Sequence, residues 1–81
     1  MNGTCPACKL SLDFTPWAEG AASFEICPHC GIQFGYSDEA GGSLDKRSKL
    51  HRLWHDAWVA NNKRPLSKEQ ELQVIVSALS N

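Results

Sequence analysis

The sequence has no long apolar segment. Its longest uninterrupted apolar runs are three or four residues, far short of the roughly 20 that a membrane-spanning helix needs. The opening MNGTCPACKL has neither a basic start nor an apolar stretch, so we expect no secretory signal and a reducing, cytoplasmic location. No Ser-His-Asp grouping, phosphate-binding glycine loop or carboxylate pair stands out, and no enzyme is predicted.

The chain is also too short to bury a large hydrophobic core. Its 81 residues include only 9% aromatics, and its 21% charged residues carry both signs, a composition typical of a small folded protein. A domain of this size buries little apolar surface, so an additional staple, meaning a covalent cross-link or a bound metal ion, is expected to stabilise it. In a reducing compartment that staple is not expected to be a pair of structural disulfides.

Four cysteines supply the staple. They form two C-x2-C pairs with eighteen residues between them: Cys5, Cys8, Cys27 and Cys30. This spacing is typical of a site in which four thiolates hold one Zn²⁺ at tetrahedral corners. Gly31 follows the second pair and tolerates the positive φ with which the chain turns away, whereas Lys9 stands there in the first pair.

The second pair has an alternative interpretation. Cys27-Pro-His-Cys30 is also the active-site pattern of oxidising thioredoxin-like proteins. That chemistry needs the pair to open a helix in a βαβ unit, whereas here GIQFGY follows and resembles a strand. The metal site is favoured, with thiol redox chemistry at Cys27 and Cys30 as an alternative and His29 as a solvent-facing spacer.

Alternating apolar residues predict short strands around the pairs. The alternation covers residues 10–14, 23–26 and 32–36. Residues 15–22, TPWAEGAA, are expected to be a turn-rich connection in which Trp17 covers a sheet edge. Residues 1–42 are therefore predicted to be a zinc ribbon.

Residues 43–81 are predicted to form two helices. Ser43 or Asp45 can cap the first, which has helical periodicity through LDKRSKLHRLWHDAWVANN. Ser67 and Gln70 form a capping box at the start of the second. The predicted fold is small α+β: a zinc ribbon followed by a helical hairpin packed on it as one compact domain.

Two stretches, SFEICPHCGIQFGYSD and LHRLWHDAWVANNKRP, resemble the small bacterial proteins called cysteine-rich CPCC proteins. The resemblance spans roughly residues 5–65. It implies that Cys5, Cys8, Cys27 and Cys30 are the metal-binding set, and it implies no activity. Ala7 and His29 stand where that family often has a further cysteine.

Charge is divided along the chain. Residues 1–43 hold one basic and five acidic residues, whereas residues 44–64 hold six basic and two acidic ones. Four of the basic residues lie in the first predicted helix: Lys46, Arg47, Lys49 and Arg52. They are either the solvated face of an amphipathic helix or a contact for nucleic acid.

Apolar residues of the helices raise the question of partners. Trp54 and Trp58, one turn apart, either pack on the ribbon or bind another protein. A second stripe either folds back on the first helix or pairs with a copy or a partner: Leu72, Ile75, Val76 and Leu79. His51 and His55 are four residues apart, but no third metal ligand accompanies them, so they are expected to be solvated or partly packed.

The predicted function is a non-catalytic zinc-binding adaptor or regulatory protein that binds another protein through its C-terminal helices. The first alternative is a nucleic-acid-binding accessory protein that uses the basic helix at residues 44–64. The second is a thiol redox protein that uses Cys27 and Cys30.

Overall fold

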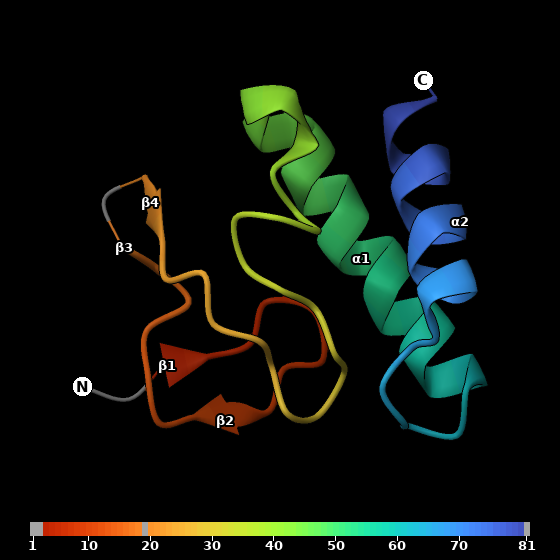
Figure 1. The fold of residues 1–81 in the computed structure, drawn as a ribbon, viewed down its shortest axis with the longest axis horizontal. Coiled ribbons are helices and arrows are strands. Elements are labelled where there is room, and N and C mark those ends of the chain that lie inside the picture. The colour runs from red at the N-terminus through yellow and green to blue at the C-terminus, as the bar shows by residue number, and fades with distance from the viewer. Residues whose placement is uncertain (1–2, 19, 81) are drawn as a thin grey trace.

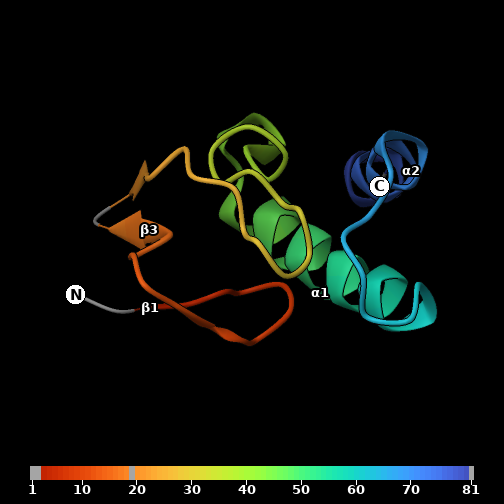
Figure 2. The same cartoon turned by 60° about the horizontal axis from the view of Figure 1, so that its bottom comes forward.

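The computed structural model describes residues 3–18 and 20–80. It is a small α+β arrangement in which short strands and loops occupy the first half and two helices the second. In Figure 1, α1 (Leu44–Ala60) lies between the strand half and α2 (Lys68–Leu79), and Figure 2 shows the same order from a second direction. The α+β class and the pair of C-terminal helices are confirmed.

The described strands form two separate antiparallel pairs. The first joins β1 (Gly3–Thr4) to β2 (Ser11–Leu12), and the second joins β3 (Trp17–Ala18) to β4 (Ala21–Ala22). The first pair flanks the first cysteine pair. The second pair corrects the sequence interpretation of residues 15–22, because the expected connection is itself a hairpin.

The expected strands around the second cysteine pair are reduced to one bridge, between Ile26 and Gln33. The chain then turns: the backbone N–H groups of Tyr36 and Ser37 both donate to the Gln33 carbonyl, at 3.1 and 2.9 Å. Gly35, with φ of 90°, takes the left-handed conformation that the turn requires. The prediction of a strand over residues 32–36 is therefore wrong, since a turn ends the extended segment.

Both helices begin where the sequence predicts. The Ser43 side chain accepts a hydrogen bond from the Lys46 N–H at 3.2 Å, so Ser43 is the cap of α1. Ser67 and Gln70 form the expected capping box of α2. Within residues 3–18 and 20–80, neither helix is both long and apolar enough to cross a membrane.

The face of α2 that packs on α1 differs from the predicted stripe. Val74 and Ala78 are buried, and Ile75 packs against the core from its edge. Leu72 and Val76 are 55% and 61% exposed, and Leu79 is exposed as well. The predicted apolar stripe is therefore mostly on the outside, because Val74 and Ala78 lie on the face of α2 that is buried.

The core joins the helices to the strand half. It contains Leu50, Trp54 and Trp58 of α1. Ile32 and Phe34 are fully buried against them in the same cluster. These apolar side chains surround the cysteines, so the core and the cysteine cluster form one unit.

Candidate metal centre

The two cysteine pairs lie in loops with the same backbone hydrogen bonds. In the first, the Cys5 N–H donates to the Leu10 carbonyl and the Lys9 N–H donates to the Cys5 carbonyl, both at 2.9 Å. In the second, Cys27 N–H donates to the Ile32 carbonyl at 2.8 Å and Gly31 N–H to the Cys27 carbonyl at 2.9 Å. Two similar turns thus present two sulfurs each.

Each turn needs a residue with positive φ directly after its second cysteine. Gly31 fills this position with φ of 82°, and Lys9 fills it with φ of 69°. A Cβ in the left-handed region costs about 1 kcal/mol or more, so the first loop carries strain that the second does not. Gly31 also lies close to Pro65, whose Cβ would be 3.3 Å from an added Cβ.

The four sulfurs gather in one buried cluster. Cys5, Cys8, Cys27 and Cys30 are each at most 3% exposed, and their Sγ atoms all lie within 4.8 Å of one another. The Cys5–Cys30 and Cys8–Cys27 sulfur distances are both 3.7 Å. A tetrahedron with metal–sulfur bonds of about 2.3 Å has edges of about 3.8 Å. The cluster therefore has the size that a metal ion with four thiolate ligands needs.

The electrostatics of the cluster favour a cation. Interaction with the Cys30 and Cys5 thiols lowers the pKa of Cys27, and the same contacts with Cys27 raise the pKa of Cys30 and of Cys5. Burial raises the pKa of Cys8 to about 12. Burial therefore opposes the charged form of these thiols, and four thiolates need a divalent ion among them.

Helix α1 holds the second loop through two indole N–H groups. Trp54 Nε1 donates to the Cys30 carbonyl at 3.1 Å, and Trp58 Nε1 donates to the His29 carbonyl at 3.0 Å. Trp54 is fully buried and Trp58 is 5% exposed. Of the two alternatives for these side chains, packing on the strand half fits the structure, and the role of exposed partner contacts is corrected, because neither forms an exposed ridge. They fix the cysteine loop instead.

The first loop has a matching contact. His55 Nδ1 lies 2.8 Å from the Ala7 carbonyl, between the two cysteines of that pair. The hydrogen bond requires the proton on Nδ1, because a carbonyl only accepts. Three ring nitrogens of α1 thus bind carbonyls of both loops, and α1 orients the two sulfur pairs toward each other.

A second buried polar cluster surrounds Asp38. Its carboxylate accepts hydrogen bonds from Trp17 Nε1 at 2.8 Å, from the Gly35 N–H at 2.6 Å and from His51 Nε2 at 2.7 Å. Burial alone would raise the pKa of Asp38, but the hydrogen bonds from His51, Gly35 and Trp17 outweigh it and lower that pKa below its ordinary value. Asp38 therefore stays ionised and joins the strand half to α1.

Sequence reasoning missed this cluster. Asp38 falls in the turn-like YSDEA, where an acidic residue is normally solvated. Its two side-chain partners, Trp17 and His51, lie 21 positions before and 13 positions after it, so no local pattern marks them. Trp17, expected to cover a sheet edge, instead begins β3 and donates to Asp38, whereas His51 is partly packed, as expected.

The four predicted basic contacts are not equivalent. The Arg47 guanidinium lies 3.7 Å from the centre of the Trp17 ring, and its Nε donates to the Asp38 carbonyl at 3.1 Å. Lys46 and Lys49 are half-buried, whereas Arg52 is exposed. The structure brings Arg47 into the Asp38 cluster and leaves the others around α1.

The chain matches no protein-family model, no curated protein and no solved structure. The resemblance to cysteine-rich CPCC proteins therefore remains a prediction based on the two quoted stretches.

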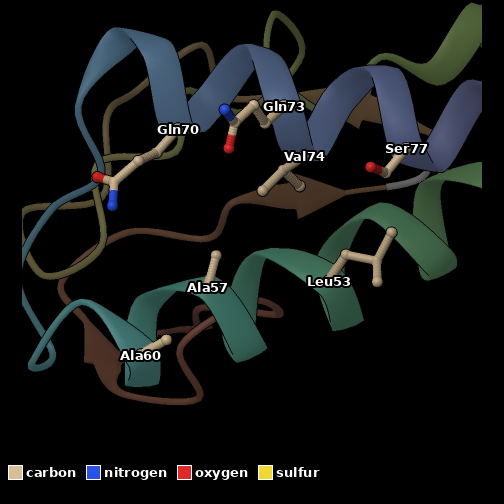
Figure 3. A pocket seen from close by; sticks show the side chains of 7 residues that line it. All are labelled: Leu53, Ala57, Ala60, Gln70, Gln73, Val74 and Ser77. Atoms are coloured by element: carbon tan, nitrogen blue, oxygen red, sulfur yellow. The ribbon is translucent and has the colours of Figure 1, made fainter.

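A hollow also lies between the helices (Figure 3). It has a volume of about 310 Å³. Its lining comes from both helices: Leu53, Ala57 and Ala60 of α1, and Gln70, Gln73, Val74 and Ser77 of α2. Among these described lining residues none is ionisable at neutral pH, so the hollow offers packing and amide contacts rather than acid–base chemistry.

Proposed function

We propose that the four cysteines bind one structural Zn²⁺ and that residues 1–42 form a zinc ribbon. The size of the sulfur cluster carries this proposal, because distances of 3.7 Å fit the edges of a zinc–thiolate tetrahedron. Four thiolate ligands leave no open coordination position for an activated water. The site is therefore non-catalytic, and zinc binding contributes folding free energy to a chain with a small core.

We further propose that the protein is an adaptor that binds another protein through its C-terminal helices. The support is the outer face of α2, where Leu72, Val76 and Leu79 are 55%, 61% and 40% exposed. Their spacing of four and three residues places them along one side of the helix. A shallow hollow of about 480 Å³ lies on this α2 face, lined in part by Leu72 and Val76.

The α2 face could bind a partner helix or a second copy of the chain. Amphipathic helices with apolar residues at this spacing pair in both ways. The homodimer predicted through Leu72, Ile75, Val76 and Leu79 is kept in the proposal with one change. Ile75 packs toward the core, so Leu72, Val76 and Leu79 make the contact.

The redox alternative has less support. Cys27 and Cys30 are 1% and 0% exposed, whereas a thiol that exchanges with a substrate disulfide must be accessible. Each also lies 3.7 Å from a sulfur of the other pair. Both observations favour a shared metal.

Elemental analysis of the purified, reduced protein tests the metal, with one equivalent of zinc expected. Removal of zinc with a chelator should abolish the far-ultraviolet helix signal and expose all four thiols to a thiol reagent. Protein without stoichiometric metal, or a fold that survives chelation, contradicts the zinc proposal.

Affinity purification tests the adaptor. Leu72→Ser, Val76→Ser protein should lose its partner, or its dimer in sedimentation analysis, while Val59→Ser protein should retain it. Val59 is a suitable control because it is an exposed apolar residue of α1, 47% open to solvent. Unchanged recovery from the α2 variant removes the α2 face from the binding proposal.

A further inference from the structure

Two neighbouring hollows lie along α1 on the side of the first cysteine loop. Their volumes are about 590 and 390 Å³. Both are lined by Pro6, Ser48 and His51, so they adjoin each other along the helix. We call these two hollows together the α1 groove. Its larger part is in the size range of sites that hold small ligands or single side chains.

The larger hollow is mainly apolar. Pro16, Trp17 and Leu44 line it together with Pro6. Leu44 is 71% exposed although it begins a helix beside this hollow. An apolar side chain placed here would cover surface that water now contacts, which favours binding of a partner with an apolar residue.

Positive groups line the rest of the groove. Arg47 lies in the larger hollow, and Lys9 and Arg52 lie in the smaller one. Among the described residues that line either hollow, none is aspartate or glutamate. The chain as a whole is slightly acidic, so this concentration of cations marks the groove as a place for a negative partner.

One of these groups is held in a fixed position. Arg47 stacks on Trp17 at 3.7 Å and binds the Asp38 carbonyl through Nε, so its terminal nitrogens remain for a ligand. A fixed donor loses little conformational freedom on binding, which favours affinity.

We propose that the α1 groove binds a short acidic peptide segment of a partner protein, with one apolar side chain in the larger hollow and carboxylates beside Lys9 and Arg52. Recognition of acidic motifs by clustered cations is a known mode of peptide binding. A long nucleic acid is disfavoured, because the acidic first half of the chain repels an extended polyanion.

This site is separate from the α2 face. An adaptor binds two partners and needs a surface for each; the α2 face is one, and the α1 groove, which binds an acidic peptide, is the other. The α1 groove rests on the proposed adaptor function only because an adaptor needs this second surface. Leu72→Ser, Val76→Ser protein should still bind an acidic peptide, so failure of one proposal leaves the other intact.

Fluorescence polarisation with zinc-loaded protein tests the groove. The probe is a short fluorescein-labelled peptide of glutamates with one central leucine. The same peptide with glutamine in place of glutamate is its control. We expect the glutamate peptide to bind, the glutamine peptide to fail, and the affinity to fall as salt is raised. No binding of the glutamate peptide at low salt, or equal binding of both peptides, overturns the proposal.

Variants locate the site. Lys9→Gln, Arg52→Gln protein should bind the glutamate peptide about fivefold more weakly or worse, since two exposed ion pairs are lost. Arg64→Gln, at an exposed residue outside both hollows, should bind like the parent chain. Leu44→Ala protein should also bind about fivefold more weakly, whereas Val59→Ala should not. Parent-like binding by the Lys9, Arg52 and Leu44 variants overturns the assignment.

A competition experiment separates the two classes of polyanion. A single-stranded oligothymidine with the same number of charges as the peptide should displace it only at higher concentration. An oligonucleotide that competes at lower concentration than unlabelled peptide overturns the proposal in favour of nucleic acid.

Discussion

Replacing Trp54 by phenylalanine tests the connection between α1 and the metal site. Trp54 is fully buried, and its Nε1 donates to the carbonyl of Cys30, one of the four proposed ligands. Phenylalanine keeps an aromatic ring but removes the N–H. Partners that bind the ligand-bearing groups of a metal site typically change metal affinity by about 10- to 100-fold.

The magnitude can be estimated from the contacts. The Cys30 carbonyl also accepts a hydrogen bond from the Leu66 N–H at 3.3 Å, so Trp54→Phe leaves it with one donor. The loss is then an ordinary net hydrogen bond, about 1 kcal/mol. The smaller ring leaves a cavity that adds about 1 kcal/mol. We expect about 2 kcal/mol in total, or roughly 30-fold in zinc affinity if binding and folding are coupled.

Competition with a chromophoric chelator measures the zinc affinity, and urea unfolding at fixed free zinc measures the stability. Trp58→Phe is the matched control, because its Nε1 binds the carbonyl of His29, which is not among the four cysteines. It should cost a similar amount of stability, about 1–2 kcal/mol from the lost hydrogen bond and the smaller ring, but change zinc affinity less than Trp54→Phe does. A Trp54→Phe protein with parent-like affinity and stability, or a Trp58→Phe protein with the larger loss of zinc affinity, would refute the reasoning.

Three other outcomes are expected. Asp38→Asn should destabilise the fold by about 2–3 kcal/mol in urea unfolding, because an amide nitrogen cannot accept from the donors around this buried carboxylate; Asp13→Asn, at an exposed carboxylate, should stay within about 0.5 kcal/mol. Lys9→Gly should stabilise the zinc-loaded protein by about 0.5–1 kcal/mol, whereas Gly31→Ala should destabilise it by about 1–2 kcal/mol, since both positions have positive φ; equal effects of the same sign would contradict this. Zinc binding should release protons to an indicator dye in weak buffer, and zinc affinity should fall as pH falls, because burial raises the pKa of Cys8 to about 12 and zinc binds the thiolate; zinc uptake without proton release would count against thiolate ligation.

The helices and the cysteine cluster could be predicted because their signals are local. Ser43, Ser67 and Gln70 cap their helices through side chains within three residues. The two C-x2-C pairs fix their own turns, and each turn closes on a carbonyl five residues away from its first cysteine. Such features need no knowledge of the tertiary structure.

The strands could not be predicted in the same way. Alternation over residues 32–36 suggests an extended segment, and Ile32 and Phe34 are indeed both buried. Tyr36, the next residue in the pattern, is 74% exposed because the chain turns at Gly35. Period-two alternation thus predicts burial correctly at Ile32 and Phe34 but not at Tyr36. Alternating burial does not prove a strand, because residues that lead into a turn can be buried in the same pattern.

The face of α2 was ambiguous for a different reason. Its apolar residues occur at so many positions that two stripes fit helical periodicity. The sequence favoured the stripe that contains Leu72 and Val76, whereas packing on α1 buries Val74 and Ala78. Helical periodicity alone does not choose between the two stripes, because the choice depends on where the neighbouring helix packs.

Helix α1 contacts both cysteine loops and the Asp38 cluster. Trp54, His55 and Trp58 bind the carbonyls of the cysteine loops, and His51 binds Asp38 on the adjoining side of the helix. Each contact uses a ring nitrogen, whose direction follows from only two side-chain torsions, so the helix can hold the loops with little loss of side-chain entropy. Because the same helix carries the α1 groove and packs against α2, loss of zinc should disturb both proposed binding surfaces. Peptide binding and partner recovery are therefore expected to disappear together when zinc is removed, although separate variants abolish them one at a time.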